Sequence, residues 1–209
     1  MKRIWTIILL ASAVRAADVT LWMTGQAIVD NPLRYTATRQ ASRMFAGIGV
    51  SLEWEKAMPT TPEGVVIEVR FAAGLAGHPG SMAFSTPFDS KPAITVLCDR
   101  ILLSTERVSP GDRATVFAYV LAHELGHVLM RSNQHSPDGM MKAHWTTSDL
   151  VRITHRSLAF LPIDQDAIRR GIASFEAQRA RRLGANEVNS GAAPASSPPK
   201  LASESANRK

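Results

Sequence analysis

Residues 116–141 read VFAYVLAHELGHVLMRSNQHSPDGMM. The first half of this stretch is apolar at nearly every position, which is typical of a buried helix. Upstream, Ser109 and Asp112 have the spacing of a helix-capping pair, and Pro110 suits the first helical position. These features predict one long helix from about Pro110 to about Arg131.

His123, Glu124 and His127 form the pattern H-E-x-x-H inside this helix. The two imidazoles lie about 6 Å apart on one face, close enough to bind one ion, and Glu124 is turned about 100° so that it can reach a water on the metal. A zinc ion held by three protein ligands keeps a fourth position for water and lowers its pKa to about 7. We therefore predict that His123 and His127 bind Zn²⁺ and that Glu124 is the general base and acid.

The segment after the helix contains His135 and the turn Gly139-Met140-Met141. This arrangement resembles the metzincin metallopeptidases, in which a third histidine follows the helix and a methionine turn passes beneath the metal. The resemblance covers roughly residues 17–160, and its specific part is His123 to Met141. It implies peptide-bond hydrolysis and an α+β, zincin-like fold. In that fold a small twisted mixed sheet packs on the long active-site helix, and a further C-terminal helix follows the methionine turn. It also implies that Met141 packs beneath the metal without binding it.

The third ligand departs from the usual metzincin pattern. That pattern, H-E-x-x-H-x-x-G-x-x-H, places a glycine and the third histidine where this chain has Met130 and Asn133. His135, two residues later, is the expected third ligand, because imidazole binds zinc far better than a carboxamide does. The alternatives are Asn133 and, from the next helix, Asp149.

Other elements follow from periodicity and turn residues. Strands are expected at 19–23, 50–54, 65–71 and 93–97, with an irregular edge strand inside 72–92. Further helices are expected at 31–47, from about 147 to 160, and from Asp164.

Residues 1–16 have the layout of a secretory signal peptide. Lys2 and Arg3 precede the apolar run Ile4 to Val14, and the small-residue site ends at Ala16. The run is too short for a bilayer, which needs about 20 residues, so we expect export to the periplasm or medium without stable membrane insertion. A catalytic domain is expected at 17–183, followed by a disordered tail at 184–209 that is poor in large apolar side chains.

Charge and cysteine usage exclude other classes of protein. The net charge of +6 falls to about +3 without residues 1–16, and the basic C-terminal part lacks a nucleic-acid-binding motif. The single cysteine, Cys98, cannot form an internal disulfide and is expected to be a buried, inert thiol.

The sequence therefore predicts a secreted zinc endopeptidase that acts on protein or peptide substrates and binds no nucleic acid. One alternative is a secreted binding or structural module stabilised by a metal, but Glu124 would have no role there. The other is a chance pattern without metal. His144 is a candidate for lining a substrate pocket, whereas His78 and His155 are not expected to be ligands.

Overall fold

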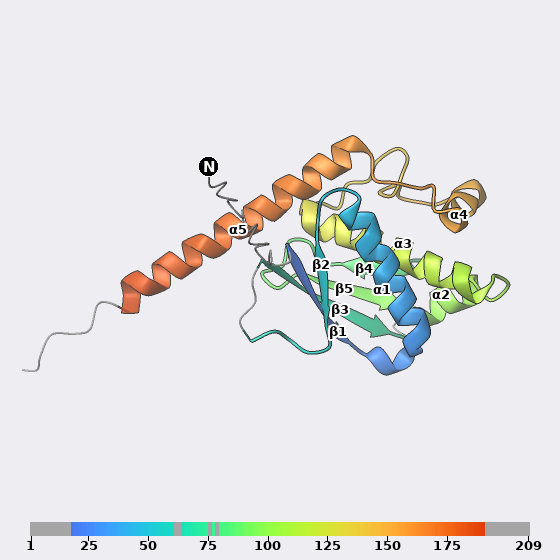
Figure 1. Cartoon of the computed structure of the whole chain (residues 1–209), viewed down its shortest axis with the longest axis horizontal. Helices are drawn as coiled ribbons and strands as arrows, with labels where there is room; N and C mark the ends of the chain where they lie inside the picture. Colours follow the sequence, from blue (N-terminus) through green and yellow to red (C-terminus); the bar gives the residue numbers. More distant parts are fainter. Residues whose placement is uncertain (1–17, 61–63, 75–76, 78–79, 191–209) are drawn as a thin grey trace, which may run out of the picture. The chain divides into compact units, whose positions relative to one another are not determined.

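The computed structural model describes residues 18–60, 64–74, 77 and 80–190 (Figure 1). The predicted signal peptide, His78 and residues 191–209 lie outside these ranges, so the expectations for them stay predictions. The chain divides into two compact units, the first ending at Glu176 and the second beginning at Ala177. All residues of the predicted metal site belong to the first unit.

A mixed sheet of five strands forms one layer of the first unit. Its strands are β1 (Val19–Thr24), β2 (Leu52–Glu55), β3 (Val65–Ala72), β4 (Ala83–Ser85) and β5 (Ala93–Leu97). Their spatial order is β2-β1-β3-β5-β4, and only β4, at the edge, runs antiparallel to its neighbour. Buried and more exposed side chains alternate along most of β3, which is typical of a strand with one covered face. The mixed sheet and its short edge strand confirm the sequence prediction.

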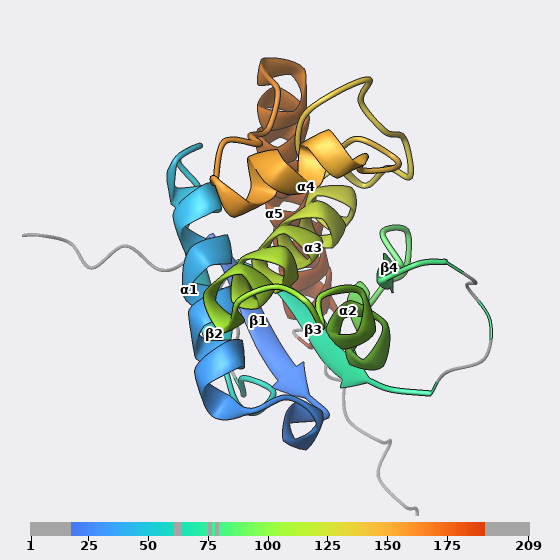
Figure 2. The same ribbon diagram turned by 90° about the vertical axis from the view of Figure 1, so that its right-hand side faces the viewer.

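Two helices pack side by side on one face of the sheet (Figure 2). Helix α1 (Asn31–Ala46) contacts β2, and helix α3 (Pro110–Met130) contacts β4 and β5. The Ser109 side chain caps α3 by accepting the N–H of Asp112, and Asp30 caps α1 in the same way. Both helices begin where the sequence predicts. Among the described residues, no helix is long and apolar enough to span a bilayer.

The core lies between the sheet and these two helices. Its fully buried side chains include Leu21, Ile67 and Ile94 from the sheet and Phe45, Phe117, Leu121 and Leu125 from the helices. Because α3 is buried along almost its whole length, the H-E-x-x-H motif lies on a rigid element.

Two short helical elements have no counterpart in the sequence predictions. One is η1 (Gln26–Ile28), and the other is α2 (Cys98–Ser104), which directly continues β5. Cys98 is fully buried at the start of α2, and burial raises the pKa of its thiol to about 11. The thiol is therefore protonated and inert at neutral pH, as predicted.

Helix α4 (Thr147–Thr154) is shorter than predicted and does not reach Phe160. It ends because Arg156 adopts the left-handed conformation, with a φ of 55°, and the Ser157 N–H bonds back to the last turn. Glycine is the usual residue at such a helix end. The arginine at this position leaves no signal in the sequence.

Helix α5 (Pro162–Ser190) is longer than predicted at both ends. It begins two residues before Asp164, whose carboxylate accepts the N–H of Leu161 and so caps the first turn. It also continues through Gly184, where the sequence predicts a disordered tail. The predicted tail therefore begins too early, because good helix formers surround this single glycine, which costs only about 1 kcal/mol relative to alanine.

Candidate metal centre

His123 and His127 lie one turn apart on α3, with their Nε2 atoms 3.1 Å from each other. Each Nδ1 atom lies 2.8 Å from a backbone carbonyl oxygen, that of Met140 for His123 and that of Ser132 for His127. A carbonyl oxygen can only accept, so both Nδ1 atoms carry the proton and donate it. Both Nε2 atoms of the neutral rings are then bare acceptors that face each other.

His135 joins this pair from the loop after α3. Its Nε2 atom lies 3.2 Å from that of His127, and one ligand atom of each histidine lies within 4.8 Å of the other two. The helix ends after Met130 because Arg131 is left-handed, with a φ of 51°, and the Ser132 N–H bonds to the carbonyl oxygen of His127. Arg131 thus makes the turn for which glycine is usual. The longer loop returns His135 to the pair, as the sequence predicts.

The two alternative third ligands are placed differently. The Asp149 carboxylate accepts a hydrogen bond of 2.6 Å from the Lys142 ammonium. It also accepts hydrogen bonds from the N–H and the hydroxyl of Thr146, and the Thr146 side chain in turn accepts the N–H of Asp149. These bonds, that to Lys142 first, hold the pKa of Asp149 well below its usual range. Asn133 is exposed on the loop. Within the described part of the chain, the three histidines are the one group of metal-ligating side chains that converges.

The electrostatics of the three imidazoles fit a metal cation. Burial lowers the pKa of His123 to about 4 and also lowers the pKa values of His127 and His135, so the rings are neutral at neutral pH. A cation between the Nε2 atoms of His123 and His127 would remove the repulsion between their lone pairs. Tetrahedral zinc, with bonds of about 2.0–2.1 Å, requires nitrogen atoms about 3.3 Å apart. The observed separations of 3.1 and 3.2 Å are close to this value.

Glu124 is the carboxylate of the motif, and its side chain is buried, with 9% of the residue exposed. The Ser85 hydroxyl, from edge strand β4, donates a hydrogen bond of 2.7 Å to its Oε2 atom. Burial raises the pKa of Glu124 to about 7, although the Ser85 hydrogen bond acts in the opposite direction. A carboxyl group with a pKa near neutrality can both accept and release a proton.

The predicted methionine turn packs directly against the motif. Gly139 begins the turn with a φ of 78°, and a Cβ there would lie 2.7 Å from a backbone carbonyl oxygen, so only glycine fits. The Met141 side chain is fully buried, and its Sδ occupies the space where a Cβ on Gly126 would be. The preceding carbonyl, that of Met140, holds His123. Met141 therefore packs against the helix that carries the motif.

The side chain of Trp145 packs against the first histidine. The Trp145 ring packs edge-on to His123, with centroids 5.5 Å apart, and Tyr119 packs on Trp145 at 6.4 Å. Burial raises the pKa of Tyr119, which keeps its hydroxyl protonated. His144 is exposed beside Trp145, and His155 is exposed at the end of α4 outside the histidine cluster.

Ser85 and Trp145 are not among the residues that the sequence predicts for the site. Ser85 is 39 residues from Glu124, in a strand whose pattern carries no chemical motif. Trp145 lies four residues after Met141, and that spacing next to a methionine turn is the one signal that could have drawn attention to it.

No protein-family model matches this sequence, and no curated protein matches it. Among solved structures, the chain is similar to archaemetzincin from Methanopyrus kandleri, with a TM-score of 0.47 and 16% sequence identity. The similarity covers 76% of this chain and 96% of that one. The chemistry of the candidate site rests on the side chains described above.

Proposed function

We propose that the chain is a zinc-dependent endopeptidase in which His123, His127 and His135 bind one Zn²⁺ ion. The observation that carries this proposal is the pair of Nε2 acceptors that face each other at 3.1 Å, with both Nδ1 protons held by carbonyl oxygens. The buried Glu124 carboxyl beside them supplies the proton acceptor that a purely structural metal site does not need.

A bound zinc ion would polarise a peptide carbonyl group and lower the pKa of a water molecule. Glu124 accepts the proton of the attacking water and later donates it to the nitrogen of the leaving amine. Ser85 holds the Glu124 carboxylate in place for both transfers. The carbonyl oxygens of Met140 and Ser132 fix the orientation of two imidazoles and make them more basic ligands.

Zinc content and a single substitution test this proposal. The wild type and Glu124→Gln are purified, analysed for zinc, and assayed with an unfolded protein as substrate. We expect both to contain one zinc ion and the variant to lose about a hundredfold or more of the activity, because it cannot take up the proton. Glu106→Gln, at an exposed carboxylate after α2, is the matched control and should keep full activity.

Two results would contradict the proposal. If the purified wild type contains no zinc after incubation with the ion, the three histidines do not form a zinc site. Zinc in both proteins with equal hydrolysis, or none, would indicate a secreted module in which the metal only ties α3 to the following loop.

We also propose export, supported by the N-terminal pattern of basic, apolar and small residues. Cells that express the full chain should yield a mature protein whose N-terminal sequence begins at Ala17. A protein that stays in the cytoplasm with residues 1–16 attached would contradict this part of the proposal.

A further inference from the structure

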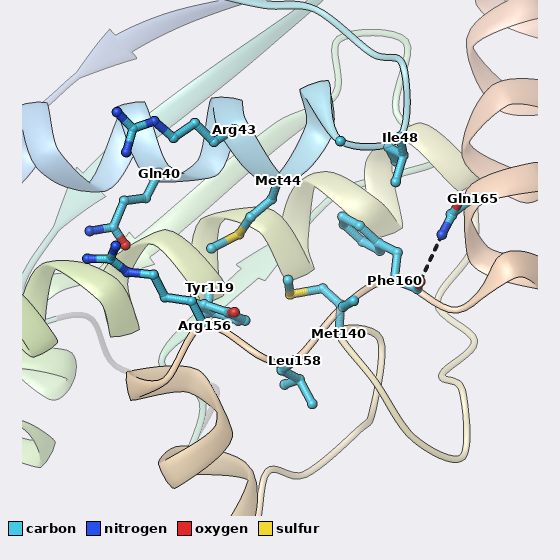
Figure 3. A pocket seen from close by; sticks show the side chains of 12 residues that line it. Gln40, Arg43, Met44, Ile48, Tyr119, Met140, Arg156, Leu158, Phe160 and Gln165 are labelled. Carbon is cyan, nitrogen blue, oxygen red and sulfur yellow. Dashed lines mark hydrogen bonds between the residues drawn. The ribbon is translucent and has the colours of Figure 1, made fainter.

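A cavity is lined by the side chain of Met140, next to the methionine turn (Figure 3). The Met140 carbonyl oxygen holds His123, whereas the Met140 side chain lines this cavity. The cavity has a volume of about 390 Å³, which is within the range of small-ligand sites. It is formed by α1, Tyr119 of α3 and the segment 156–160, and none of the metal-centre side chains lines it.

The cavity has a cationic end and a mainly apolar end. In Figure 3 the side chains of Gln40, Arg43 and Arg156 extend toward one end, with the Arg43 guanidinium set apart from the other two polar groups. Ile48, Phe160 and Gln165 lie at the other end, where the Gln165 amide donates to the Phe160 carbonyl oxygen. The side chains of Met44, Met140 and Leu158 lie between the two ends. A ligand that fills the cavity therefore needs a polar head and a hydrocarbon part.

The cationic end contains one buried atom without a partner and two exposed arginines. Gln40 is 8% exposed, and its Oε1 atom is buried without a hydrogen-bond donor among the described residues. A buried acceptor without a donor destabilises a protein, so such an atom calls for an explanation. Within the described residues, neither Arg43 nor Arg156 forms an ion pair. Arg156 also holds a left-handed backbone conformation that is unusual for a residue with a side chain.

We propose that this cavity binds the C-terminal residue of a peptide that ends in an apolar amino acid. The terminal carboxylate pairs with the guanidinium groups of Arg43 and Arg156. The last backbone N–H donates to the Gln40 amide oxygen, which turns toward the ligand in the complex. The apolar side chain lies along Met44 and Leu158. A fatty acid would lack the N–H donor, and a neutral sugar would lack both the anion and the hydrocarbon part.

Three small probes separate the parts of this recognition. N-acetyl-leucine has the carboxylate, the N–H and the apolar side chain, whereas N-acetyl-leucinamide lacks the charge and 4-methylpentanoate lacks the N–H. Titration calorimetry with the zinc-loaded full chain should show saturable binding of N-acetyl-leucine. The amide should bind roughly tenfold more weakly, because it loses charge-assisted hydrogen bonds, and 4-methylpentanoate should also bind more weakly. Equal binding of the acid and its amide, or no saturable binding, would overturn the proposal.

Arginine variants locate the carboxylate. Arg43→Gln and Arg156→Gln should each weaken the binding of N-acetyl-leucine about two- to fivefold, as expected for guanidinium groups that remain partly in solvent. Arg39→Gln makes the same charge change on α1 at an exposed residue that does not line the cavity, and it should leave affinity unchanged. If all three variants bind like the wild type, the acid binds elsewhere, for instance at the zinc ion, and the proposal fails.

Gln40→Met separates recognition from packing. Methionine has a similar shape but no acceptor, so the variant should melt at a higher temperature than the wild type because the unsatisfied oxygen is gone. It should also lose the preference for N-acetyl-leucine over 4-methylpentanoate. A higher melting temperature with an unchanged preference would show that Gln40 only packs, which contradicts the proposal. Binding is measured directly, so this test stands even if the chain hydrolyses no peptide.

Discussion

Gly126, the third residue after His123, is a position where the packing of the candidate metal centre is sensitive to a single methyl group. A Cβ on residue 126 would overlap the Sδ of Met141 and would lie 3.0 Å from its Cε and 3.4 Å from the Phe160 ring. Because Met141 is fully buried, it cannot move aside into solvent. Overpacking of this kind costs about 1–3 kcal/mol, and alanine recovers up to about 1 kcal/mol of helix propensity. Gly126→Ala should therefore lower the free energy of unfolding by about 1–2 kcal/mol.

Thermal unfolding measures this effect, and a loss of that size corresponds to a fall in Tm of roughly 2–8 °C for a unit of this length. Gly111→Ala is the matched control, because it lies on the same helix with nothing nearer to its Cβ than the Ser109 hydroxyl at 3.9 Å. It should leave Tm unchanged or raise it slightly. Met141→Ala alone should cost about 2–5 kcal/mol. It should cost less in the Gly126→Ala background, because the overlap is then gone. Strictly additive effects, or a Gly126→Ala protein as stable as the control, would refute the packing of the methionine turn against the motif.

Three further predictions concern the site and its surroundings. His135→Ala should lower zinc affinity by at least about tenfold, whereas His144→Ala should leave it unchanged, as measured by competition with a chelator. The opposite result would show that His135 is not the third ligand. Ser85→Ala should lower kcat while zinc content stays the same, because Glu124 loses the hydroxyl that positions it; an unchanged kcat would show that this bond has no role in turnover. The depressed pKa of Asp149 means that its stabilising contribution is complete above the unfolded-state pKa of about 3.9 and is lost as pH falls toward the lower folded-state value. Asp149→Asn should therefore lower Tm at pH 7 and flatten its decline in acid, and an unchanged acid profile would contradict that assignment.

The helical part of the site could be predicted because it depends on neighbours in the chain. Ser109 and Pro110 mark the start of α3, and two histidines four residues apart share a face in any α-helix. The same local logic located β1, α1 and the other main strands. The end of α3 near Arg131 was also predicted, whereas the end of α4 was not, because Arg156 takes the left-handed conformation for which glycine is usual.

The order of the strands and the supporting contacts of the site could not be predicted in this way. Ser85 reaches Glu124 only because β4 returns antiparallel to β5 at the sheet edge that α3 covers. The Met140 carbonyl reaches His123 only because a closed turn lies against Gly126. Neither contact corresponds to a periodic pattern or to a fixed residue spacing in the sequence.

The amino-acid sequence alone thus determines helix α3, its cap and the relative positions of His123, Glu124 and His127. Hydrogen bonds between backbone groups four residues apart impose that geometry. The sequence predicts that His135 returns to the other two histidines only through the preference of zinc for imidazole ligands. Tertiary packing decides where His135 lies, because it brings a ligand atom of each of the three histidines together. It also directs the Nδ1–H groups of His123 and His127 toward backbone carbonyl oxygens. Packing also created the cavity beside Met140, because its walls come from segments that only the folded core brings together.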